Sequence, residues 1–141
     1  MFEFGQRING ISYEPRPGAY AIVINADGKV AIIKTSAGFF LPGGGIEQNE
    51  TTETALVREV REECGWEVII LNKVAEAVQY VHAPSEGFFA KQCFFYRCSV
   101  HGRAASPVEY DHQTLWLEIA EARKRLTHES QSWAIAQAIR T

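Results

Sequence analysis

The chain has 141 residues and a net charge of −3 at pH 7, with 46% hydrophobic and 22% charged residues. This composition is typical of a globular protein and excludes a disordered chain, while the acidic balance argues against non-specific binding to nucleic acid. No apolar run approaches the ~20 residues of a membrane span and the N-terminus lacks a signal-peptide pattern, so we expect one cytoplasmic domain over 1–141 with no membrane partner.

The first predicted elements are two β-rich runs at 20–24 and 29–34. The segment 25–28 between them ends in Asp-Gly, a strong turn signal, so the two runs are predicted to form a hairpin.

A glycine-rich loop at 42–45 comes next, and a helix is predicted to follow it over 50–64. Asn49 is the expected N-cap and Gly65 the expected C-cap of this helix.

The rest of the chain alternates strands with two short helices. Strands are predicted at 66–71, 74–81, 92–100 and 115–117, a loop at 82–87, and helices at 119–126 and 129–139. The three cysteines have no paired spacing, which predicts buried free thiols: Cys64, Cys93 and Cys98. This order predicts a mixed α/β (α+β) fold in which helices pack on a mixed sheet.

Three carboxylates share one face of the predicted helix at about 100° per residue: Glu59, Glu62 and Glu63. An apolar face adjoins it (Leu56, Val57, Val60 and Cys64), and a third face is polar and basic (Thr54, Arg58 and Arg61). Like charges at these spacings repel by a few tenths of a kcal/mol per pair. The carboxylate face is therefore either a site for a hard cation such as Mg²⁺ or Mn²⁺, or a solvated acidic surface.

The spacing around these carboxylates is specific. The segment reads Gly44-x5-Glu50-x7-Arg58-Glu59-Val60-x-Glu62-Glu63-x-Gly65-Trp66. It resembles the signature of the Nudix (MutT-like) hydrolase family, with Trp66 at a position where an aliphatic residue is more usual. The order of elements around it is also similar, which implies the Nudix-type α/β/α sandwich with a mixed β-sheet between helices.

The resemblance implies a metal-dependent pyrophosphohydrolase that cleaves a phosphoanhydride bond in a nucleoside diphosphate derivative, with Mg²⁺ or Mn²⁺ as cofactor. It assigns metal binding and catalysis to Glu59, Glu62 and Glu63, with the carbonyl of Gly43 as a further ligand. It gives structural roles to Gly44, Glu50, Arg58 and Gly65, with Glu50 and Arg58 forming an ion pair. The general base stays open between Glu62, Glu63 and two acidic residues of later loops, Glu86 and Glu109.

The substrate is not defined by this segment. Residues 109–118 resemble the acidic-His-Gln-x-x-Trp-Leu stretch of the asymmetric diadenosine tetraphosphate hydrolase branch, with Asp111 where that branch has Glu. The candidate substrates are dinucleoside polyphosphates, nucleoside triphosphates, nucleotide sugars and ADP-ribose. The candidate substrate-binding residues are Phe39, Tyr80, Lys91 and His112. The alternative function is a Nudix domain that senses a nucleotide without cleaving it, and the family resemblance also allows a homodimer.

Overall fold

The computed structural model describes residues 1–103 and 111–140. The strands in these ranges are β1 (Phe2–Phe4), β2 (Glu14–Pro15), β3 (Gly18–Val23), β4 (Lys29–Thr35), β5 (Gly38–Phe40), β6 (Gly43–Gly45), β7 (Trp66–Ala83), β8 (Gly87–Arg103) and β9 (Gln113–Glu118). The helices are α1 (Thr52–Cys64), α2 (Ile119–Arg125) and α3 (Glu129–Arg140). None of the described helices has the length and apolar character that crossing a membrane requires.

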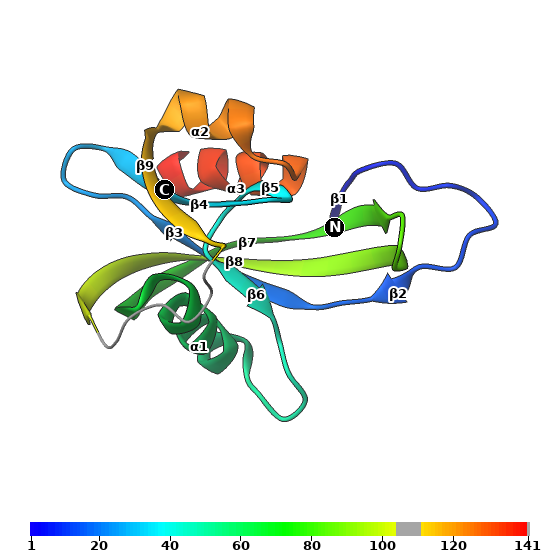
Figure 1. Cartoon of the computed structure of the whole chain (residues 1–141), viewed down its shortest axis with the longest axis horizontal. Coiled ribbons are helices and arrows are strands. Elements are labelled where there is room, and N and C mark those ends of the chain that lie inside the picture. Colours follow the sequence, from blue (N-terminus) through cyan, green and yellow to red (C-terminus); the bar gives the residue numbers. More distant parts are fainter. Residues whose placement is uncertain (104–110, 141) are drawn as a thin grey trace.

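The strands form two sheets. In the described residues a six-stranded sheet has the order β1-β7-β8-β3-β6, with β2 also paired to β8, and a three-stranded sheet has the order β5-β4-β9. The larger sheet is mixed, because β3 runs parallel to β8 while β7 and β8 are antiparallel. Figure 1 shows α1 on one side of the β7–β8 ribbon and α2 and α3 on the other. The expected α/β/α sandwich with a mixed sheet is confirmed.

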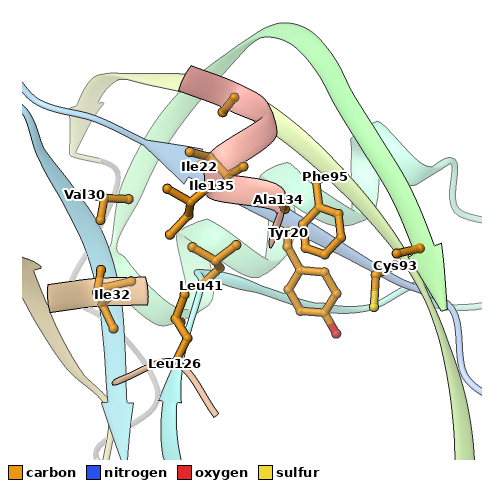
Figure 2. Packing of buried hydrophobic residues seen from close by; sticks show 13 residues of the cluster. Tyr20, Ile22, Val30, Ile32, Leu41, Cys93, Phe95, Leu126, Ala134 and Ile135 are labelled. Carbon is orange, nitrogen blue, oxygen red and sulfur yellow. The ribbon is translucent and has the colours of Figure 1, made fainter. Parts of the chain in front are cut away.

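Strand β3 is buried on both faces. Tyr20 and Ile22 belong to the core cluster that includes Ile135 of α3, whereas Ala21 belongs to the second cluster with Leu56 of α1. Figure 2 shows Tyr20 and Ile22 beside Ile135 and Ala134, with the Tyr20 hydroxyl at the edge of the cluster. A strand covered on both faces has an uninterrupted apolar sequence, which is the reason for the β-rich run at this position.

The predicted hairpin of the first two runs is wrong in its pairing. The turn exists, since the Asn25 N–H donates to the Lys29 carbonyl at 2.9 Å. Beyond the single bridge between Ile24 and Val30, however, the two strands separate into different sheets. β3 pairs with β8 and β6, and β4 pairs with β5 and β9. The turn residues determine the reversal of the chain, whereas burial of both faces determines the partners of each strand.

The predicted N-cap of the long helix is also wrong. Thr51, not Asn49, caps α1, because its side-chain oxygen accepts a hydrogen bond from the Thr54 N–H at 3.1 Å. Asn49 lies in the preceding turn with a left-handed φ of 71°, a conformation that asparagine tolerates. The C-cap prediction is confirmed, because Gly65 has φ 71° and its N–H donates to the Arg61 carbonyl at 2.9 Å.

The predicted strands at 66–71 and 74–81 are one long strand, β7, with register irregularities at Ile70/Asn72 and Lys73/Ala75. The predicted loop at 82–87 narrows to a turn at 84–86, since β7 and β8 continue to pair as far as Ala83 and Gly87. Both C-terminal helices lie where they were predicted. The three cysteines are buried free thiols, as expected.

Trp66, where the chain leaves α1, stacks on Trp116 of β9. The two ring centroids are 5.5 Å apart and the ring planes differ by 26°. Two aromatic faces in this arrangement contribute about 0.5–1.5 kcal/mol beyond their buried area. The stack therefore joins the C-terminal end of α1 to the smaller sheet.

Candidate active site

The glycine-rich loop forms strand β6 and lies between β3 and α1. Gly43 is paired with Tyr20 of β3 and has φ 143°, a conformation that other residues rarely adopt. A Cβ atom at Gly43 would also collide with the Ala19 carbonyl oxygen. Only glycine therefore allows the loop to pass this close to β3 and bring its backbone to the carboxylates of α1.

Glu63 is the most buried of the three helix carboxylates, with 8% of the residue exposed. Its Oε1 accepts a hydrogen bond from the Gly43 N–H at 2.8 Å, and its Oε2 lies 3.1 Å from Nδ1 of His112. Glu63 thus connects α1, the glycine loop and the residue that precedes β9.

Glu59 lies against the next glycine of the loop. A Cβ atom built on Gly44 would be 2.6 Å from both Cδ and Oε2 of Glu59. The Glu59 side chain is 16% exposed and its Oε1 accepts a hydrogen bond from Arg58 at 3.1 Å. Glu62 is more accessible, with 37% of its side chain exposed and a 2.7 Å bond from Arg58 to its Oε1.

Arg58 holds the loop and the helix together. Its Nε and Nη2 donate to the two carboxylate oxygens of Glu50 at 2.7 and 2.9 Å, and Nη2 also donates to the Gly45 carbonyl at 3.0 Å. Bidentate arginine–carboxylate pairs of this kind are among the stronger hydrogen-bonded pairs. Arg58 lies on the polar and basic face of the helix, yet these contacts leave only 25% of its side chain exposed.

The Arg58–Glu50 pair predicts a specific dependence of stability on pH. Hydrogen bonds from Arg58 lower the pKa of Glu50 from 4.5 to about 2. A depressed carboxyl pKa stabilises the fold above the unfolded-state pKa and stops doing so as the pH falls through the folded-state value. We expect the melting-temperature difference between wild type and Glu50→Gln to be largest above pH 4.5 and to shrink as the pH approaches about 2.

Thermal unfolding monitored by circular dichroism at several pH values measures this difference. The control is Glu121→Gln, which removes an exposed i,i+4 contact to Arg125 on α2 and should have little effect at any pH. A Glu50→Gln difference that does not change with pH would contradict the prediction.

A cavity of about 240 Å³ lies beside the carboxylates. It is lined by Tyr20, Thr35, Phe40, Leu41, Gly43, Gly44, Glu63, Lys91, His112, His128 and Gln131. Two of the four predicted substrate-binding residues, Lys91 and His112, are in this lining, and Phe39 and Tyr80 are not. The cavity therefore lies between the glycine loop and α1 on one side and β8 and the start of α3 on the other.

The absence of Phe39 and Tyr80 from the cavity lining follows from strand geometry, because neighbouring residues of a strand face opposite sides. Phe40 lines the cavity, while Phe39 packs against the core cluster of β3 and α3. Gln79 faces α3, since its Oε1 accepts a hydrogen bond from the Ser130 N–H at 3.0 Å. The next residue, Tyr80, instead donates its hydroxyl to Glu3 at 2.9 Å.

Sequence reasoning did not find Gln131, His128 or Tyr20 as cavity residues. Gln131 is 1% exposed, and its Oε1 accepts the Leu41 N–H at 2.8 Å, so it fixes the strand end next to the glycine loop. A glutamine on the apolar side of a predicted helix is the signal that could have identified it, because buried amides need partners. Burial raises the pKa of Tyr20, with further contributions from the nearby Cys93, Glu63 and Glu59.

Of the two alternative general bases, Glu86 and Glu109, the structure places only Glu86, and it does not bring Glu86 to the cavity. Glu86 lies in the exposed turn between β7 and β8 and is not part of the cavity lining. Glu109 falls outside the described residues.

The carboxylates beside the glycine loop are of the chemical type that binds a hard cation. Glu59 and Glu63 place carboxylate oxygens against the glycine loop, and such oxygens are the ligands that Mg²⁺ and Mn²⁺ prefer. Within 1–103 and 111–140, no group of three or more His, Cys, Asp or Glu side chains is already arranged to hold a metal ion. Glu62 is instead hydrogen-bonded to Arg58.

A family model for the NUDIX domain matches residues 14–138. Among solved structures, a NUDIX hydrolase from Nitrosomonas europaea superposes with a TM-score of 0.74 at 18% identity, over 89% of this chain and 88% of that one. A MutT NUDIX hydrolase from Burkholderia pseudomallei has a TM-score of 0.68 at 24% identity, over 88% and 98% of the two chains. An ADP-ribose pyrophosphatase from Streptococcus suis has a TM-score of 0.65 at 19% identity, over 90% and 93%. No curated protein matches the chain.

Proposed function

Because the chain belongs to the Nudix hydrolase family, we propose that it is a divalent-metal-dependent pyrophosphohydrolase that cleaves a phosphoanhydride bond in a nucleoside diphosphate derivative. The observation that carries the proposal is the contact of two α1 carboxylates with the glycine loop beside the cavity. Glu63 accepts the Gly43 N–H, and Glu59 lies against Gly44. Carboxylates fixed against a backbone loop suit the binding of a cation and the phosphates that it neutralises.

In this proposal Glu59, Glu62 and Glu63 hold the metal, and the carbonyl of Gly43 is a further ligand. Mg²⁺ or Mn²⁺ bound there would neutralise phosphate charge and lower the pKa of a bound water. Arg58 acts as a positioning residue, because it donates to both Glu59 and Glu62 while it holds Glu50 and the Gly45 carbonyl.

We assign the role of general base to Glu62. Glu63 has both carboxylate oxygens engaged, Oε1 by the Gly43 amide and Oε2 by His112. Glu62 accepts from Arg58 through Oε1, and 37% of its side chain is open to solvent. In the proposed step the water oxygen forms a bond to phosphorus while Glu62 accepts the water proton. The anhydride P–O bond breaks, and the leaving phosphate keeps the electron pair.

The cavity limits what part of the substrate it can hold. Its volume of about 240 Å³ lies below the roughly 300–1,000 Å³ of a site for a drug-sized ligand, so it accommodates one part of a nucleotide. Dinucleoside polyphosphates and nucleoside triphosphates are the first substrate classes to test. ADP-ribose follows, because a similar structure is named an ADP-ribose pyrophosphatase.

Product analysis by chromatography tests the proposal. The purified protein is incubated with Mg²⁺ or Mn²⁺ and a panel of nucleoside triphosphates, dinucleoside polyphosphates, ADP-ribose and nucleotide sugars. We expect cleavage of at least one class into two phosphorylated products, and loss of that cleavage when EDTA removes the metal. Nucleotide binding without cleavage of any class would contradict the proposal and favour the non-hydrolytic sensor.

A further inference from the structure

Two basic side chains line the cavity away from α1. Lys91 comes from β8 and His128 immediately precedes α3, and both belong to the same cavity lining as Glu63 and Gly43. The His128 ring packs edge-on against Phe40 with centroids 5.4 Å apart, which fixes the imidazole at the cavity wall. The cavity thus has the Glu63 carboxylate on one part of its wall and the side chains of Lys91 and His128 on another.

The charge of Lys91 is not balanced inside the cavity. Within 1–103 and 111–140, no carboxylate lies within ion-pair distance of its ammonium group. Burial lowers the pKa of Lys91, Arg16 lowers it further, and Cys93 and Glu86 act in the opposite direction. A half-buried ammonium group without a close counter-ion is costly, and an anionic ligand would reduce that cost.

At pH 7 the neutral form of the His128 imidazole is favoured. Burial, with a further contribution from Lys91, lowers the pKa of His128 to about 4. Among residues 1–103 and 111–140, the other titratable side chains of the cavity wall are Tyr20 on β3, Glu63 on α1 and His112 before β9. Glu63 affects the pKa of Tyr20, but Lys91 is the only charged group among the described residues that perturbs His128.

We propose that Lys91 and His128 form a binding subsite for a doubly charged phosphoryl group of the substrate, and that His128 takes up one proton when this group binds. The proton comes from the solvent and forms an N–H bond on the imidazole, which then donates to a phosphoryl oxygen. Charging His128 beside Lys91 costs Coulomb repulsion, which two negative charges bound between them offset more fully than one, so the subsite favours a dianion over a monoanion.

This preference narrows the substrate class, and here the inference rests on the proposed function. A terminal phosphoryl group carries close to two negative charges at neutral pH, because its second pKa is near 6. A phosphate esterified or bridged on both sides carries one. The subsite therefore favours a nucleoside di- or triphosphate with a free end over a dinucleoside polyphosphate, a nucleotide sugar or ADP-ribose.

Titration calorimetry of sulfate into the metal-free protein tests the subsite without any reaction. Sulfate keeps two negative charges from pH 5 to pH 8, the range in which histidine commonly titrates. Uptake of one proton on binding should strengthen sulfate affinity by up to about tenfold for each pH unit of acidification. Affinity that does not change with pH, or no measurable binding at all, would overturn the proposal.

Variants identify the groups involved. His128→Gln should bind sulfate with affinity independent of pH, and Lys91→Met should lose most of the binding. The matched controls are His101→Gln on the exposed end of β8 and Lys124→Met on the exposed surface of α2, which should behave as the wild type. Melting temperatures establish that each variant is folded. A pH dependence that persists in His128→Gln would show that the proton goes to another group and would overturn the role of His128.

Kinetics extend the test to substrate choice. His128→Gln should lower kcat/KM for a nucleoside triphosphate about tenfold or more, and should change kcat/KM for a polyphosphate capped at both ends much less. An equal loss for both substrates would overturn the claimed selectivity. A protein that binds sulfate in the proposed manner but cleaves nothing would contradict the proposed function and leave the anion subsite intact.

Discussion

Replacing Glu62 with glutamine is expected to reduce kcat by about 10²–10⁴-fold, the range associated with loss of a general base. The substitution keeps the size of the side chain and its ability to accept from Arg58, but it removes the charge that binds a cation and the basicity that takes a proton from water. Arg58 retains its bidentate pair with Glu50, so the loop and helix should stay together. Steady-state kinetics with the substrate class identified by product analysis measure the loss.

The matched control is Glu53→Gln on the same helix, where Glu53 lies exposed in the first turn. It makes the same chemical change at a position away from the glycine loop, and its kcat should stay within about twofold of wild type. Circular dichroism should give nearly equal melting temperatures for both variants. An unimpaired Glu62→Gln enzyme would remove this residue from the mechanism and transfer the role to Glu63.

Replacing Gly44 with alanine is expected to lower kcat/KM by about 10²-fold while leaving the melting temperature close to that of wild type. The new methyl group would be 2.6 Å from the Glu59 carboxyl carbon, so the carboxylate has to move. The Glu59 side chain is flexible and can shift at small cost to folding, but misplacing a catalytic group by about 1 Å can cost 10²-fold in rate. This variant should therefore lose activity while it keeps its thermal stability.

Gly45→Ala is the control for this substitution. It is the neighbouring glycine of the same strand, and a Cβ atom there meets nothing within 4 Å. We expect wild-type kinetics from Gly45→Ala, measured in parallel with Gly44→Ala. If both variants lost activity equally, general stiffening of the loop would explain the loss, and the specific contact with Glu59 would not.

The helix that carries the carboxylates could be predicted almost completely from the sequence. Its periodicity places Glu59, Glu62 and Glu63 on one face, and Gly65 ends it as expected. These features are local, because each depends on residues within a few turns of the helix. The error at the N-cap is also local. Asn49 and Thr51 both precede the helix and both can cap it, but only Thr51 is placed so that its side chain accepts the Thr54 N–H.

The cavity could not be predicted in the same way, because it is formed by residues that are distant in sequence. The Leu41 N–H donates to Gln131, 90 positions away, and His112, just before β9, lies 3.1 Å from Glu63 of α1. The choice between Phe39 and Phe40 depended on which face of β5 meets the cavity, and a three-residue strand has no periodicity that reveals it. The hairpin failed for a similar reason, since the partners of β3 lie far along the chain.

The stack of Trp66 on Trp116 has a consequence for the mobility of α1. A helix attached at one point can pivot, whereas a helix attached at two separate points cannot. Arg58 attaches the middle of α1 to the preceding loop through Glu50 and the Gly45 carbonyl, and Trp66, just after the C-terminal end of α1, stacks on Trp116 of β9. The carboxylates of α1 therefore keep their orientation before any ligand arrives, so that little rotational entropy is left to lose when the reaction begins.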